Sequence, residues 1–269
     1  MSQGTLWLGL ARLAVRLPWM AGEFLLFTLE YARRRLCVRG ALSLPERARW
    51  VQWASRRLLR VCGGSVMPAG KTPSHGLLVC NHLSYLDILV LTAVTPAVFV
   101  AKREVRAWPV FGWLARMGGT LFVDRARRGD VVRLAEEMER AMETGVLLVL
   151  FPEGTSTNGR HVLPFKSSLL EPACRRPQAL SAACLHYEMT DGDASNDACY
   201  WGDVTLLPHL LKLLARRGVT AQVRFTECNY SPDRKELAQR LHGVVVGLLA
   251  SMTEANPSSS SPQPAVANA

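Results

Sequence analysis

The fold is decided by the stretch LLVCNHLSYLD, residues 77–87. Its first four residues are apolar and follow a proline and a glycine, a pattern that predicts a short buried strand. Ser84 with Asp87 three residues later has the form of a helix N-terminal cap, so we expect a helix to begin near Tyr85. His82 is then placed in the turn between the strand and the helix.

The turn determines whether His82 can meet Asp87. On one continuous helix, a separation of five residues would place the two side chains about 140° apart. In a strand-turn-helix, the turn folds His82 back so that Asp87 accepts a hydrogen bond from one ring nitrogen. The other nitrogen can then act as a general base for a substrate hydroxyl. The spacing alone fits a surface histidine beside a capped helix equally well.

Outward from this stretch, short apolar runs alternate with amphipathic segments, which is typical of an α/β domain. The predicted strands cover residues 77–80, 97–100, 120–123, 146–151, 180–185 and 222–225. The predicted helices cover residues 85–94, 110–117, 130–143, 204–217 and 232–252. We therefore expect one α/β domain at residues 63–253, followed by a disordered tail at 254–269 that is rich in Pro, Ser and Ala.

The N-terminal segment, residues 6–31, is apolar apart from four charged side chains. At about 100° per residue, these charges fall within a wedge of about 40°; they are Arg12, Arg16, Glu23 and Glu30. The pattern favours a helix that lies in the membrane interface or is partly embedded, rather than a simple span. A core helix of a soluble fold is the alternative. A second helix, rich in Trp and Arg, is predicted at residues 45–61. Together with the N-terminal segment it leads us to expect membrane-associated helices over residues 1–62.

Composition narrows the classes of partner. The net charge of +10 indicates anionic partners, and the N-terminal segment favours a membrane surface over nucleic acid, for which no binding motif is visible. The seven cysteines have no C-x-x-C spacing, which indicates reduced thiols and predicts neither a disulfide framework nor a zinc site. We expect no cofactor and no metal. No G-x-S-x-G elbow is present, which argues against a lipase or thioesterase with its own nucleophile.

Three blocks of sequence resemble the signatures of the glycerolipid acyltransferases, the family typified by 1-acylglycerol-3-phosphate acyltransferase. They are NHLSYLD at residues 81–87, GGTLFVDR at 118–125 and FPEGT at 151–155, and they occur in the family's order. The resemblance covers roughly residues 76–187. It implies a glycerol-3-phosphate acyltransferase-like fold, a mixed β-sheet flanked by helices.

The resemblance also implies roles for individual residues. His82 and Asp87 match the catalytic pair, which would activate the hydroxyl of a lysolipid for attack on the thioester of acyl-CoA or acyl carrier protein. The acceptor-binding positions are Arg125, Glu153, Gly154 and Thr155, and Lys166 is a further candidate for contact with the head group. The product expected first is phosphatidic acid, made from 1-acylglycerol-3-phosphate. The expected location is the cytoplasmic face of a membrane, the inner membrane of a bacterium.

Two departures from the family pattern bear on the acceptor. Ser156 stands where the family commonly has an arginine after the threonine, and Ala182 stands where a proline is usual. The serine, together with VLPFK at 162–166 and WGD at 201–203, resembles a bacterial branch that includes acyltransferases of lyso-ornithine lipid. That acceptor is the alternative. A more distant alternative is a lipid-binding protein at the membrane surface that has no catalytic activity. Such a function would not require the pair formed by His82 and Asp87.

Overall fold

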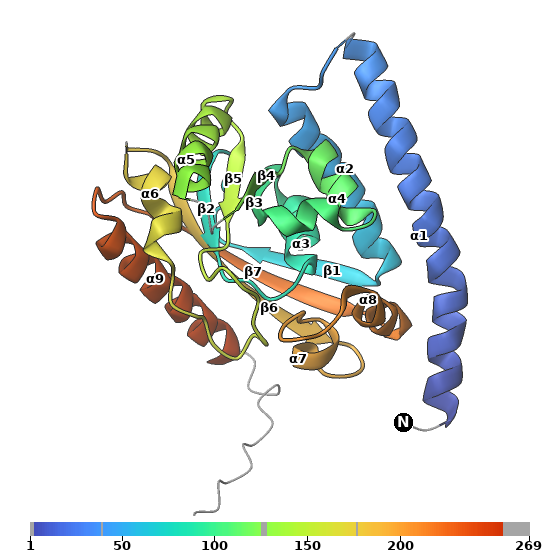
Figure 1. Ribbon diagram of the computed structural model, residues 1–269. Helices are drawn as coiled ribbons and strands as arrows, with labels where there is room; N and C mark the ends of the chain where they lie inside the picture. Colours follow the sequence, from blue (N-terminus) through green and yellow to red (C-terminus); the bar gives the residue numbers. More distant parts are fainter. Residues whose placement is uncertain (1–2, 39, 125–127, 176, 255–269) are drawn as a thin grey trace, which may run out of the picture.

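The fold is built on one seven-stranded sheet with the order β1-β7-β6-β2-β5-β3-β4 (Figure 1). It is seen in a computed structural model that describes residues 3–38, 40–124, 128–175 and 177–254. The strands are β1 (Gly64–Ala69), β2 (Gly76–Cys80), β3 (Ala97–Lys102), β4 (Leu121–Val123), β5 (Leu147–Leu150), β6 (Leu180–Met189) and β7 (Val219–Cys228).

The sheet is mixed. The strands β2, β3, β4, β5 and β6 run parallel to one another, whereas β7 is antiparallel to β6, and β1 is parallel to β7. This confirms the predicted single α/β domain with a mixed sheet, and all six predicted strands are present. The strand β1 was missed because it is an edge strand with mostly exposed residues and contains Pro68, which sheets tolerate only at an edge.

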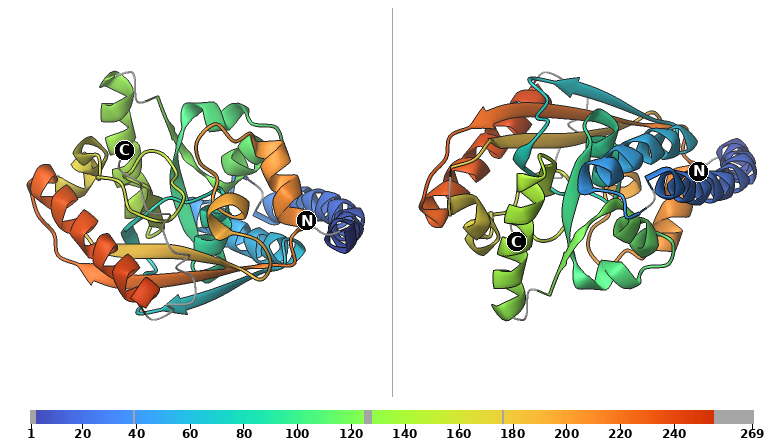
Figure 2. Two further views of the ribbon diagram at one scale, coloured as in Figure 1. Left: turned by 90° about the horizontal axis from the view of Figure 1, so that it is seen from below. Right: turned by 90° about the horizontal axis from the view of Figure 1, so that it is seen from above.

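Helices cover both faces of the sheet (Figures 1 and 2). They are α1 (Gln3–Val38), α2 (Leu44–Val61), α3 (Leu86–Val94), α4 (Phe111–Gly118), α5 (Arg128–Glu143), α6 (Glu171–Cys174), α7 (Ala194–Asp197), α8 (Leu206–Ala215) and α9 (Arg234–Glu254), with 3-10 turns η1 (Arg103–Ala107) and η2 (Ser167–Leu170). One core joins alternate residues of β2 and β5 to α5 and α9, and the second joins the other residues of these strands to α2, α3 and α8. Both strands are therefore buried on both faces, as expected for central parallel strands.

The helix α1 runs along the outside of α2 and α8 and turns its polar stripe towards them (Figures 1 and 2). The Arg12 guanidinium donates to Ala215 O at 3.1 Å, and that of Arg16 donates to Leu214 O at 3.0 Å and Arg217 O at 2.9 Å. These carbonyls lie at the C-terminal end of α8, where backbone acceptors have no partner inside the helix. The predicted wedge of charges is therefore a stripe that docks α1 onto the domain.

The same stripe continues to α2. Glu23 is buried and its two carboxylate oxygens accept from Arg57 at 2.6 and 2.9 Å. Outside this stripe, α1 exposes many apolar side chains: Leu6, Trp7, Leu8, Leu10, Val15, Leu17, Trp19, Leu25, Leu26 and Leu29. Among the described residues, no helix combines the length and the apolar composition that a membrane crossing requires.

Candidate active site

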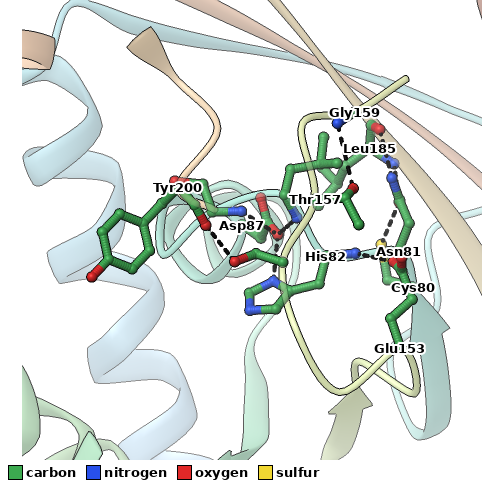
Figure 3. A network of polar contacts seen from close by, with 12 residues as sticks. Cys80, Asn81, His82, Asp87, Glu153, Thr157, Gly159, Leu185 and Tyr200 are labelled. Carbon is green, nitrogen blue, oxygen red and sulfur yellow. Dashed lines mark hydrogen bonds and ion pairs between the residues drawn. The ribbon is translucent and has the colours of Figure 1, made fainter. Parts of the chain in front are cut away.

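The site lies at the carboxyl ends of the parallel strands β2 and β5, the edge at which ligands bind in open α/β sheets. The turn that follows β2 is held from two sides. Thr157 N donates to His82 O at 2.9 Å, and Tyr200 N donates to Leu83 O at 2.8 Å (Figure 3). Loops that are distant in sequence therefore fix the backbone of the turn that carries His82.

The turn brings His82 and Asp87 together, as the strand-turn-helix reading predicted. His82 Nδ1 and Asp87 Oδ2 are 2.7 Å apart (Figure 3). Because the carboxylate lies at Nδ1, that nitrogen carries the proton and Nε2 presents a lone pair. The carboxylate is fully buried, whereas 24% of the His82 side chain is exposed. The imidazole can therefore reach a substrate while its orienting partner stays out of solvent.

Asp87 is surrounded by donors. Oδ2 also accepts from Leu83 N at 2.7 Å and Ser84 N at 3.1 Å, and Oδ1 accepts from Tyr187 Oη at 2.7 Å. The prediction that Ser84 caps α3 is wrong. The helix begins at Leu86, and the buried Ser84 hydroxyl has no hydrogen-bond partner among the described residues. The Asp87 carboxylate accepts from Ser84 N, which is one half of a capping box, but the half that the serine hydroxyl would make is not formed, and Asp87 N donates to the backbone oxygen of Ser84.

Phe151 covers one face of the His82 ring. The two rings are stacked, with centroids 4.2 Å apart and planes 16° from parallel. Phe151 also stacks with Phe99, with centroids 6.0 Å apart. Access to the imidazole is therefore restricted to its other face and to its Nε2 edge.

Glu153, at the end of β5, points into the protein. Its Oε1 accepts from His82 N at 2.7 Å and its Oε2 accepts from Leu163 N at 2.8 Å (Figure 3). Burial raises the pKa of the Glu153 carboxyl to about 7, against the opposing pull of the two backbone hydrogen bonds and His82. In this structure, the carboxylate links the backbone of His82 to the loop that follows the FPEGT block, and its role in acceptor binding stays a prediction.

The other predicted acceptor-binding residues are spread around the site. Gly154 follows Glu153 with a φ of +76°, a conformation that favours glycine. The side chains of Thr155 and Lys166 are exposed, and Lys166 N donates to Pro152 O at 2.9 Å. Arg125 lies outside the described residues. Within the described parts of the chain, no three His, Cys, Asp or Glu side chains gather as a metal site would require.

Two residues with a part in the site were missed by sequence reasoning. The Asn81 side chain pairs with both the N–H and the C=O of Leu185, at 2.7 and 3.0 Å, and thereby ties the turn to β6 (Figure 3). Tyr187 bonds Asp87 from the same strand. A polar residue directly after a buried strand was a signal for Asn81, but no local pattern points from Tyr187 to a partner 100 residues away.

An apolar cavity of about 130 Å³ lies beside the site, enclosed by α1, α2, α3, β3, η1 and α4. Tyr85 from the turn and Phe99, the ring next to Phe151, form its wall nearest to His82. Its other walls include Phe27, Trp50, Leu58, Leu89, Trp108 and Phe111. The Tyr85 hydroxyl lies 3.0 Å from His209 Nδ1, which fixes the tyrosine ring against the cavity. Such a space suits a hydrocarbon chain.

Known proteins are similar to this chain in sequence and in fold. The family model described as Acyltransferase matches residues 64–180. The chain is 40% identical over 191 residues to a lyso-ornithine lipid O-acyltransferase of Brucella abortus, which covers 65% of this chain and 71% of that protein. It is 35% identical over 209 residues to a lyso-ornithine lipid O-acyltransferase of Pseudomonas aeruginosa, with 77% and 80% covered.

Two further similarities concern enzymes of 1-acylglycerol-3-phosphate. The chain is 30% identical over 186 residues to a 1-acyl-sn-glycerol-3-phosphate acyltransferase of Neisseria gonorrhoeae, with 68% of this chain and 72% of that protein covered. The crystal structure of the 1-acyl-sn-glycerophosphate acyltransferase PlsC from Thermotoga maritima shares the fold, with a TM-score of 0.63 at 19% identity over 93% of this chain and 96% of that chain. The chain therefore belongs to the family of lysolipid acyltransferases that contains these enzymes.

Proposed function

We propose that the chain transfers a fatty acyl group from a thioester donor, acyl-CoA or acyl carrier protein, to the free hydroxyl of a lysolipid, with His82 as the general base. The observation that carries this proposal is the arrangement around His82. Nδ1 is fixed by a buried carboxylate, Nε2 has no hydrogen-bond partner among the described residues, and the stacked rings of Phe151 and Phe99 connect the imidazole to an apolar cavity that Phe99 lines. No cofactor is required for this chemistry.

The reaction follows from this geometry. His82 Nε2 takes the proton of the lysolipid hydroxyl while the oxygen attacks the thioester carbonyl carbon. The C–S bond then breaks, and the thiolate leaves with the proton that His82 had taken. Asp87 holds the reactive tautomer and stabilises the imidazolium. General base catalysis of this kind contributes about 10²- to 10⁴-fold, so the positioning of both substrates must supply further acceleration.

The cavity supports the placement of the acyl chain. Its lining is apolar, and the Phe99–Phe151 stack connects its wall to the His82 ring. A donor chain in the cavity would leave its thioester close to the imidazole. The predicted acceptor residues would then line the other side, with Glu153, Gly154, Thr155, Lys166 and Arg125 as the proposed set.

The proposed acceptor is lyso-ornithine lipid. Ser156, which stands in place of the family's arginine, donates its hydroxyl hydrogen bond to Tyr200 O, so this position offers no cation to a phosphate. An ornithine head group carries no phosphate and needs no such cation. The relatives of highest identity quoted above are lyso-ornithine lipid enzymes, which supports the same choice. The acceptor expected first from the sequence, 1-acylglycerol-3-phosphate, is the second candidate, supported by the similarity to the Neisseria enzyme.

The proposed location is the cytoplasmic face of a bacterial inner membrane, with α1 in the plane of the interface. Arg12 and Glu23 bond groups on the α8 and α2 side, and the charges near the end of the helix pair with each other, so the outer face before Glu30 presents mainly apolar side chains. A surface of this kind lowers its free energy by entering the acyl boundary of a bilayer. Leu25→Asp, on the exposed face of α1, should weaken co-sedimentation with anionic phospholipid vesicles. Met67→Asp makes the same change of charge at an equally exposed apolar position on the edge strand β1, and it should weaken co-sedimentation less.

The test of function uses membranes that contain the wild type or His82→Ala, with labelled acyl-CoA and acyl carrier protein as donors. Lyso-ornithine lipid and 1-acylglycerol-3-phosphate are offered separately. We expect transfer to lyso-ornithine lipid that is lost in the variant, and Ser156→Arg should raise transfer to the phosphate acceptor relative to the wild type. Transfer to 1-acylglycerol-3-phosphate alone would overturn the acceptor assignment, and transfer that survives His82→Ala would overturn the mechanism.

A further inference from the structure

We propose that Tyr187 is a positioning residue of the active site, which holds the Asp87 carboxylate in the orientation that His82 needs. This inference rests on the proposed general-base role of His82. Tyr187 lies on β6, outside the three sequence blocks that carry the family resemblance, and its side chain is buried. Its hydroxyl donates to Asp87 Oδ1 at 2.7 Å.

The two oxygens of Asp87 have different partners. Oδ2 faces His82 Nδ1 and the two backbone amides of the turn. Oδ1 has Tyr187 as its one hydrogen-bond partner among the described residues. The bond therefore anchors the oxygen that does not face the imidazole. Because rotation about the last bond of an aspartate has only a broad preference, an anchor on Oδ1 is what fixes the plane of the carboxylate.

Loss of this anchor would act on the histidine. The carboxylate is fully buried, so Oδ1 without Tyr187 would be a charged oxygen with no access to water. The carboxylate could recover a partner only by rotating Oδ1 towards the amides of the turn. That rotation would displace Oδ2 from His82 Nδ1 and loosen the imidazole that has to remove the proton.

The tyrosine is suited to remain a donor. Burial raises the pKa of Tyr187 well above its ordinary value, and the adjacent Asp87 charge raises it further, so the phenol stays protonated throughout the range in which the enzyme would work. The same strand also fixes the backbone of the turn, because Asn81 pairs with Leu185 two residues earlier. One strand, β6, thus positions the turn through Asn81 and the carboxylate through Tyr187.

The first test compares Tyr187→Phe with Tyr230→Phe. Both changes delete a hydroxyl that donates at 2.7 Å, but Tyr230 donates to Cys174 O, away from the pair. We expect Tyr187→Phe to lower kcat by about tenfold, the equivalent of about 1.4 kcal/mol in the barrier, with KM for donor and acceptor unchanged within about twofold. Tyr230→Phe should leave kcat unchanged. Replacement of Tyr187 by 3-fluorotyrosine keeps the hydroxyl but makes it more acidic and so a stronger donor to Asp87; it should fold and should move the His82 Nδ1–H signal described below, which tests the role if the phenylalanine variant does not fold.

The second test does not depend on turnover. In protein labelled with ¹⁵N-histidine, the Nδ1–H signal of His82, assigned by its loss in His82→Ala, should move in Tyr187→Phe and stay in place in Tyr230→Phe. A kcat equal to that of Tyr230→Phe, or an unmoved signal, would overturn the role of Tyr187. Wild-type protein inactive towards both lyso-ornithine lipid and 1-acylglycerol-3-phosphate would instead count against the proposed function, while the signal would still decide on Tyr187.

Discussion

Replacement of Glu153 by glutamine tests how a buried carboxylate is held beside the turn that carries His82. Burial raises the pKa of Glu153 to about 7 from an ordinary value of 4.5. Between these two pH values the folded protein keeps a proton that the unfolded chain has released, so the stability falls as the pH rises. The difference between 4.5 and about 7, at 1.36 kcal/mol per pH unit, corresponds to about 3 kcal/mol. This loss of stability is absent below pH 4.5 and complete above pH 7.

Glutamine does not titrate, so Glu153→Gln removes this dependence. It also accepts only one of the two amide hydrogen bonds, a loss of about 1–3 kcal/mol that does not change with pH. The stability of the variant relative to the wild type should therefore increase by about 3 kcal/mol between pH 4.5 and pH 8. The activity should fall at every pH, because the link from His82 N to Leu163 N is broken.

The assay is thermal unfolding in detergent at pH 4.5 and pH 8. With about 2–4 °C per kcal/mol for a domain of this size, the difference in Tm between variant and wild type should shift by about 6–12 °C in favour of glutamine at the higher pH. Glu227→Gln is the control, because Lys71 holds the pKa of that exposed carboxyl below its ordinary value. A difference for Glu153→Gln that is constant with pH, or that shrinks as the pH rises, would refute the argument.

Three further changes test other contacts. Asn81→Leu should lower the stability by about 1–3 kcal/mol for each of the two buried Leu185 backbone groups left unpaired, measured by chemical unfolding, and a loss below 1 kcal/mol would contradict the pairing. Ala54→Leu places a larger side chain in the cavity wall, so it should lower kcat/KM for donors with long acyl chains by about tenfold and leave kcat/KM for short-chain donors unchanged. An equal loss for all chain lengths would argue against the cavity as the acyl site. Arg57→Met should lower the free energy of unfolding by about 2–3 kcal/mol, because the buried Glu23 carboxylate is left without its cation. Adding Glu23→Leu to the same chain should restore most of this stability. A double variant no more stable than Arg57→Met would contradict this account.

The central fold was predictable because its strands are buried on both faces and appear as continuous apolar runs. The predicted runs at residues 146–151 and 77–80 correspond to β5 and β2, and the predicted helices of the domain lie within a few residues of those observed. The edge strand β1 was not predictable in the same way. Buried and exposed residues alternate only weakly along β1, and the strand contains a proline. Both features are tolerated because β1 is an edge strand and pairs with a neighbour on one side only.

The site was predictable where the contact is local. The five-residue spacing in a strand-turn-helix brought His82 to Asp87 as expected. The direction of Glu153 was not predictable, because it depends on an amide at Leu163 that the loop folds back. Tyr187 was not predictable for the same reason, since its partner is supplied by the pairing of β6 with β2 and not by sequence neighbours.

The way in which α1 docks bears on the order in which the molecule can be assembled. The helix leaves the ribosome before the domain that it contacts, and the carbonyls that receive Arg16 lie 198 to 201 residues further along the chain. Throughout that interval of synthesis the helix has an apolar face and two arginines without acceptors. Its docking onto α8 must therefore be one of the last events of folding, and the nascent helix needs a bilayer or a chaperone to hold it until residue 217 emerges.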